Sequence, residues 1–128
     1  MKKVIYRRTG PADEVLEIVD RPVPIPGPGE VRVHVAWSGV NPSDTKSRAG
    51  TRSPVLPFPE VTPHSDGSGV IDAVGQGVDP ARVGERVWLW NAAWGRPEGT
   101  AAEFVALPQA QAVPLPPVVP LEAGACLG

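Results

Sequence analysis

Residues 39–50 read Gly-Val-Asn-Pro-Ser-Asp-Thr-Lys-Ser-Arg-Ala-Gly and end an alternating strand pattern with an Asn-Pro step. Pro42 suits the first turn of a helix, because the backbone N–H at that position has no helical partner. Asn41 is a favoured N-cap residue, and Asp44 would lie near the positive end of the helix dipole. The two are three residues apart and share a helix face. We therefore expect a short helix with polar groups at its start, or a capped turn with a solvated face.

The residues before this helix form the clearest strand pattern in the chain, at 30–38. One face would carry Val31, Val33, Val35 and Trp37, and the other Arg32, His34, Ala36 and Ser38. His34 is therefore expected on a solvated face. Further strands are expected at 2–8, 14–19, 68–74, 85–90, 101–107 and 112–115, with loops at 51–63 and 91–100.

Composition favours one β domain. The chain has 128 residues, which suits a single domain, and 41% of them are hydrophobic, enough for a core. Its 17 prolines and 14 glycines disfavour long helices and stand between alternating apolar runs. These residues predict a mainly β fold, either a sandwich or a barrel.

Charge and cysteine content exclude several kinds of partner. The net charge of −2 argues against nucleic acid or an anionic membrane surface. No apolar run reaches the ~20 residues of a membrane helix, and the N-terminus has no apolar signal core. The single cysteine cannot form an internal disulfide. We expect a cytoplasmic protein.

Five stretches together resemble a known family. Residues 40–46 are accompanied, in order and spacing, by 26–31 (Pro-Gly-Pro-Gly-Glu-Val), 69–78, 84–88 and 122–128. They resemble the zinc-free medium-chain dehydrogenases/reductases, the zeta-crystallin-like NADPH:quinone oxidoreductases. The resemblance implies a GroES-like, partly open β-barrel with short helices over residues 1–120. It also implies that residues 121–128 begin the connection to a Rossmann domain.

The same resemblance predicts that no zinc is bound. Zinc members of the superfamily carry Cys where this chain has Asn41, and a His-Glu pair where it has Ser65-Asp66. An amide and a hydroxyl are poor zinc ligands. His64 stands one residue away from the metal-binding register and is expected to be a loop imidazole that caps a turn. Cys126 is alone, whereas the structural zinc of those relatives needs four cysteines.

Without a metal, the resemblance implies that the chemistry belongs to a nicotinamide cofactor. The enzymes that this chain resembles transfer a hydride from NADPH to a quinone or an activated alkene. By position, Asn41, Asp44 and Lys46 are assigned to cofactor binding. Asn41, Arg52 and Trp90 are assigned to the substrate pocket, although Trp88 and Trp90 also suit a layer that covers the sheet. No side chain is assigned as an acid or base.

Two departures from the family bear on the acceptor. Lys46 and Arg52 stand where aromatic residues are frequent, so the pocket would suit a polar or anionic acceptor. The alternative is that both are solvated surface charges.

The chain shows no glycine fingerprint for a dinucleotide, because residues 75–77 (Gly-Gln-Gly) form a turn without a following helix. We therefore expect the 128 residues alone to be inactive, with any homodimer formed through a following domain. A non-catalytic GroES-like binding or assembly module, or a related enone or alcohol reductase, are the alternatives.

Overall fold

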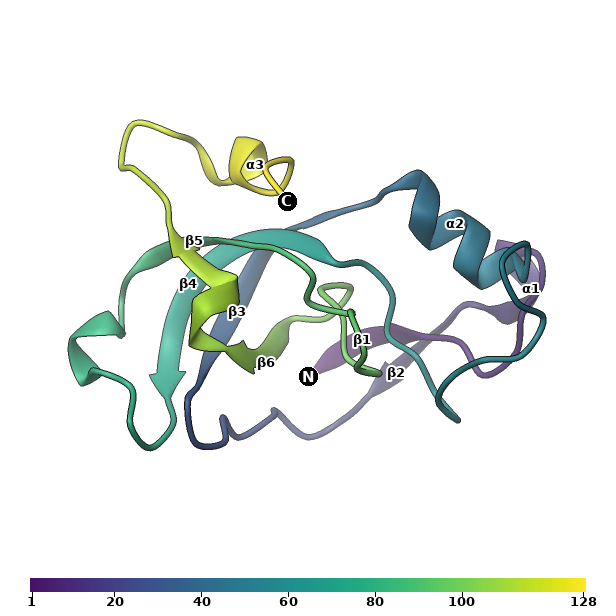
Figure 1. The fold of residues 1–128 in the computed structure, drawn as a ribbon, viewed down its shortest axis with the longest axis horizontal. Helices are drawn as coiled ribbons and strands as arrows, with labels where there is room; N and C mark the ends of the chain where they lie inside the picture. Colours follow the sequence, from purple (N-terminus) through teal and green to yellow (C-terminus); the bar gives the residue numbers. More distant parts are fainter.

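The computed structural model describes residues 1–128 and is built mainly from β-strands (Figure 1). All strand pairs are antiparallel. The strands are β1 (Lys2–Ile5), β2 (Glu17–Asp20), β3 (Glu30–Gly39), β4 (Asp66–Val74), β5 (Arg86–Leu89), β6 (Phe104–Pro108) and β7 (Ala112–Pro114). The helices are α1 (Ala12–Val15), α2 (Pro42–Ala49) and α3 (Leu121–Gly124), with single 3₁₀ turns η1 (Pro80–Arg82) and η2 (Gln109–Gln111).

The strands form two sheets that do not close. Five strands lie in the order β6-β3-β4-β5-β7, and β1 pairs with β2 alone. A bridge between Lys3 and Ala102 joins β1 to the segment that leads into β6. This arrangement confirms the expected mainly β, partly open fold of the GroES-like type.

The core lies within the five-stranded sheet. Eight of its ten members are apolar residues of the strands, mostly at alternate positions that face the same side, and two come from loops. Its members are Val31, Val33, Ile71, Val78, Val87, Leu89, Ala92, Val105, Leu107 and Ala112. A smaller cluster of Tyr6, Val15 and Val61 packs beneath the long loop, with Leu56 and Phe58 against it.

The alternation expected for β3 holds only in its first half. Val31 and Val33 are fully buried, and His34 is exposed as expected. The register to β4 shifts between Val35 and Trp37, and Trp37 is 53% exposed. Such a bulge adds an extra residue to one strand and changes the face of those that follow. The prediction that Trp37 faces the core with Val31 is therefore wrong.

Three other expected strands are wrong at their ends. The strand expected at 14–19 begins only at Glu17, because residues 12–15 form helix α1, with Asp13 and Glu14 in its first turn. Carboxylates there favour the helix by their interaction with its dipole. The strand expected over 2–8 ends at Ile5, and the one expected at 101–107 begins at Phe104.

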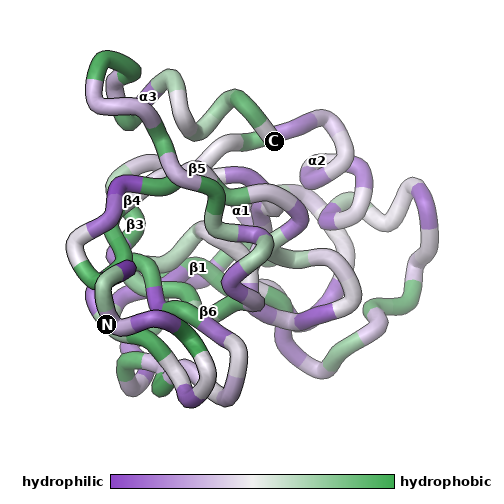
Figure 2. The backbone as a smooth tube through the Cα atoms, turned by 60° about the vertical axis from the view of Figure 1, so that its left-hand side comes forward, coloured by the Kyte–Doolittle hydropathy of each residue, from purple (hydrophilic) through white to green (hydrophobic).

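Helix α2 confirms the central sequence prediction. Asn41 is its N-cap, Pro42 opens it, and Gly50 ends it with a φ of +79°. A left-handed residue at this position is a common helix end, and glycine adopts it without steric cost. The helix has no buried residue, and Figure 2 shows it mostly in the purple of hydrophilic residues. Its start therefore leaves polar groups available at the end of β3.

Helix α3 lies beside β4 and β5 (Figure 1). The hydroxyl of Ser68 on β4 donates to the carbonyl of Leu121. The chain also approaches β3 closely, because a Cβ at Gly39 would stand 2.4 Å from the carbonyl oxygen of Ala125. A glycine at position 39 therefore allows residues 121–125 to cover the sheet next to the start of α2.

Candidate functional site

A polar site forms where β3, β4 and α2 meet. The register places Gly39 opposite Asp66, so the end of one strand faces the start of the other. The amide of Asn41 donates to Oδ2 of Asp66. The carboxylate of Asp44 accepts from the backbone N–H of Asn41 at 2.7 Å. Two carboxylates and one amide are thereby held at the first turn of α2.

A chain of hydroxyl groups continues from this point. Oγ of Ser38 lies 2.8 Å from Nδ1 of His64 and 2.8 Å from Oγ1 of Thr100. Oγ1 of Thr100 donates to the carbonyl of Asp66 at 2.6 Å. His64, Ser38, Thr100 and Asp66 therefore form one connected network, which we call the hydroxyl network.

The backbone holds His64 in an unusual conformation. Its φ is +77°, in the left-handed region that non-glycine residues adopt at a cost of about 1–2 kcal/mol. The carbonyl of His64 accepts from the N–H of Thr100 at 2.9 Å. A Cβ at Gly99 would lie 2.4 Å from that carbonyl oxygen, so only glycine allows the two segments to approach this closely. The surrounding segments thus fix the position of the imidazole.

Two ionisable groups near α2 have shifted pKa values. Burial lowers the pKa of His64, and the negative charge of Asp44 opposes that shift. Burial raises the pKa of the Tyr6 hydroxyl; Asp44 adds to the shift, and Arg48 opposes it. Burial is the main cause of both shifts, and the charge of Asp44 in the first turn of α2 acts on both groups.

The remaining sequence-predicted residues are Lys46, Arg52 and Trp90. Lys46 and Arg52 are exposed and make no ion pair or side-chain hydrogen bond. Trp90 directly follows Leu89, whose β-partner Gly67 adjoins Asp66. Its indole is 37% exposed and donates to the carbonyl of Ala110 at 3.2 Å.

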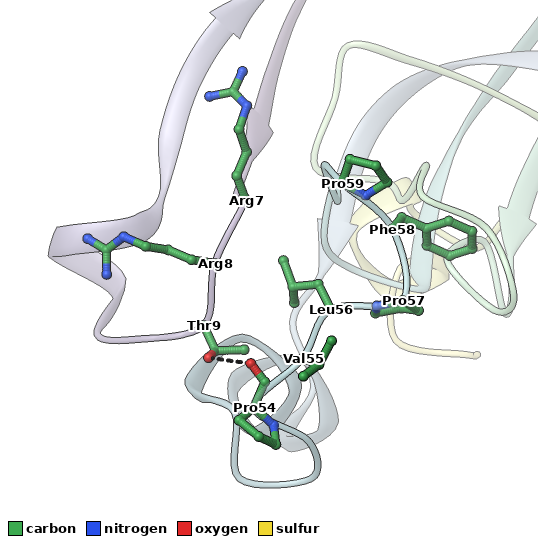
Figure 3. A pocket seen from close by; sticks show the side chains of 9 residues that line it. All are labelled: Arg7, Arg8, Thr9, Pro54, Val55, Leu56, Pro57, Phe58 and Pro59. Atoms are coloured by element: carbon green, nitrogen blue, oxygen red, sulfur yellow. Dashed lines mark hydrogen bonds between the residues drawn. The ribbon is translucent and has the colours of Figure 1, made fainter.

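An open hollow of about 520 Å³ lies along the loop that follows α2 (Figure 3). Its walls are residues 7–9 and 54–59, joined by a 3.1 Å hydrogen bond from Thr9 to Pro54. Figure 3 shows the side chain of Arg8 leading away from the loop. A Cβ at Gly50 would meet Thr9 at 2.9 Å, so the hollow adjoins the C-terminal end of α2. It is separated from Asn41 by the length of the helix, about 12 Å.

No three His, Cys, Asp or Glu side chains gather as a metal site would need. None of the helices is long and apolar enough to cross a membrane.

Three residues of the site escaped sequence analysis. Ser38 and Thr100 had no local pattern, because they lie 62 residues apart and meet only through strand register. Tyr6 sits in a segment that the sequence presents as plain strand. His64 was noted, but its partner is the hydroxyl of Ser38.

Comparison with known proteins identifies the domain. Residues 27–117 match the model of the alcohol dehydrogenase GroES-like domain. The chain belongs to that family. The GroES-like resemblance drawn from the sequence motifs is thereby confirmed.

The relatives of this domain include quinone oxidoreductases. One from Rattus norvegicus is 37% identical over 127 residues, 97% of this chain and 36% of that protein. A solved quinone oxidoreductase from Pseudomonas syringae is 35% identical with a TM-score of 0.85, covering 98% of this chain and 37% of that one. A mycobacterial protein solved in complex with NADPH is 32% identical with a TM-score of 0.82, covering 98% and 37%. The chain spans little more than a third of the length of these relatives.

Proposed function

We propose that this domain forms the substrate-side wall of an NADPH-dependent reductase of quinones or activated alkenes that works without zinc. One observation carries the proposal. The amide of Asn41 stands at the start of α2 and is bonded to the buried carboxylate of Asp66. By the resemblance, these two positions carry zinc ligands in the metal-dependent members of the superfamily. An amide in this place suits an organic ligand better than a metal ion.

The donor set fits the amide end of a nicotinamide. The Asn41 nitrogen is committed to Asp66, which orients the side chain, and Oδ1 keeps a second lone pair beside the one that caps the N–H of Asp44. A carboxamide N–H can donate to that oxygen. Residues 42–49 form α2, whose start favours a partner with partial negative charge. The phosphates would be held elsewhere, since this chain shows no glycine-rich turn leading into a helix.

When bound, NADPH supplies the hydride, and the residues of this chain position the reactants. Asp44 holds the Asn41 backbone, and Asp66 holds its side chain, so the amide cannot turn freely. A fixed wall of this kind lowers the entropy cost of bringing donor and acceptor face to face. Lys46 and Arg52, both exposed and unpaired, would draw a polar or anionic acceptor toward the mouth of the site.

The test is NADPH oxidation by the full-length native protein with a panel of quinones and α,β-unsaturated ketones. We expect turnover that Asn41→Ala reduces about tenfold or more, the effect of one misplaced contact. Ser43→Ala is the matched control, because Ser43 is exposed on the same helix turn. Absence of turnover with every acceptor would contradict the proposal and favour a non-catalytic module.

Three further parts of the proposal concern the whole protein. Residues 1–120 form the substrate-side unit and 121–128 lead toward a nucleotide-binding unit, so the 128 residues alone should not oxidise NADPH. Any homodimer would form outside this domain. The protein would act in the cytoplasm on small molecules, without nucleic acid or membrane partners.

A further inference from the structure

The hydroxyl network determines which nitrogen of His64 carries hydrogen. Thr100 must donate to the carbonyl of Asp66, because a carbonyl oxygen can only accept. Its one hydroxyl hydrogen is then used, so Ser38 must donate to Oγ1 of Thr100. Ser38 in turn has no hydrogen left for the imidazole. The contact between Ser38 and His64 is therefore a hydrogen bond donated by Nδ1–H.

The second nitrogen of His64 is consequently a free acceptor. In a neutral imidazole with hydrogen on Nδ1, Nε2 carries a lone pair. No protein group bonds Nε2, and the only fully buried side-chain polar atom without a partner is Oγ1 of Thr62. Nε2 is therefore not fully buried and is open to a hydrogen-bond donor.

Charged groups around the imidazole come from two elements. Asp44 on α2 acts on His64 through its charge. Asp66 on β4 lies two residues along the chain, and its carboxylate accepts from Asn41. Ser38 bonds the ring and Thr100 bonds Ser38, and both side chains are neutral. Protonation of His64 would therefore be favoured by Asp44 and opposed by burial.

We propose that Nε2 of His64 contacts the ligand and distinguishes a hydroxyl group, which donates a hydrogen bond, from a carbonyl group, which accepts one. The neutral ring accepts from a hydroxyl group, whereas the protonated ring donates to a carbonyl oxygen. This inference rests on the proposed function, in which the oxidised acceptor presents carbonyl groups and its reduced form presents hydroxyls. The neutral site therefore prefers the hydroquinone, and the protonated site prefers the quinone.

The tautomer is tested without ligand or turnover. The ¹⁵N signals of the His64 ring are assigned in the full-length native protein by comparison with the His64→Gly variant, which lacks them. We expect the Nδ1–H form to dominate above the His64 pKa, and Ser38→Ala to shift the balance toward Nε2–H. A dominant Nε2–H form in the presence of Ser38 would overturn the proposal.

The ligand preference is tested with tetramethyl-1,4-benzoquinone and its hydroquinone, kept reduced under inert gas. Their dissociation constants are measured on the full-length native protein, above and below the His64 pKa. We expect the ratio of the two constants to reverse, each arm changing by about two- to tenfold, the effect of one hydrogen bond. His64→Gly removes the ring and suits the φ of +77°, so it should fold and lose this reversal.

The outcomes separate the two proposals. A reversal that depends on His64 without any NADPH oxidation would support the role of His64 and reject the reductase function. If NADPH is oxidised but the ratio of the quinone and hydroquinone dissociation constants is the same in the wild type and in His64→Gly, the reductase function is supported and the role of His64 is rejected. If neither the quinone nor the hydroquinone binds, the role proposed for His64 is rejected.

Discussion

Replacing Asn41 by alanine removes two interactions from the site at once. Loss of an N-cap asparagine costs about 1 kcal/mol. Asp66, only 7% exposed, also loses the hydrogen bond from the Asn41 amide to its carboxylate. A hydrogen bond to a charged group contributes about 1.5–3 kcal/mol. The two effects together predict a loss of about 2.5–4 kcal/mol in the free energy of unfolding.

Two matched variants separate these effects in urea unfolding followed by tryptophan fluorescence. Asn41→Ser retains a good N-cap but cannot reach Asp66, so it should lose only the larger contribution. Ser43→Ala changes an exposed residue on the same turn and should stay within about 0.5 kcal/mol of the wild type. A loss in Asn41→Ala no larger than that in Ser43→Ala would refute the role given to the Asn41–Asp66 bond.

Two predictions concern stability away from the site. Burial raises the pKa of Glu60, but Arg21 and two further cations outweigh burial and leave the pKa lowered. This carboxylate therefore stabilises the fold above its unfolded pKa and loses that effect as pH falls through its folded pKa. Glu60→Gln should flatten the acid side of the stability–pH curve, and exposed Glu122→Gln should leave it unchanged. Gly69→Ala would place a Cβ 2.1 Å from the carbonyl oxygen of His34. We therefore expect the free energy of unfolding, measured by heat or urea, to fall by about 3 kcal/mol or more. An unfolding transition equal to that of the wild type would show that β3 and β4 pack differently.

Local patterns predicted the elements that depend on local chemistry. Helix α2 follows from Asn41, Pro42 and Asp44, which act within one turn of their own positions. The first half of β3 follows from its alternation. The bulge after Val35 was not predictable, because it depends on how β3 meets β4. Helix α1 was missed because the apolar residues after it belong to a separate strand.

The candidate site was predictable only in part. Asn41 and Asp44 were predicted to share a helix face, and the structure brings them together at the first turn of α2. The partners that orient them came from other segments, since Asp66 is 25 residues from Asn41. The hydroxyl network is likewise formed by strand register and by the close approach of Gly99 to the backbone of His64. Lys46 and Arg52 remain predictions as ligand-contacting residues, and their exposure suits either ligand binding or solvation.

The central claim is that an amide site, and not a metal site, lies beside the reacting molecules. It is tested by measuring zinc content and NADPH-dependent quinone reduction in one preparation of the full-length native protein, before and after treatment with a strong chelator. We predict substoichiometric zinc and an unchanged rate. One zinc ion per chain, whose removal abolishes the rate and whose return restores it, would contradict the claim.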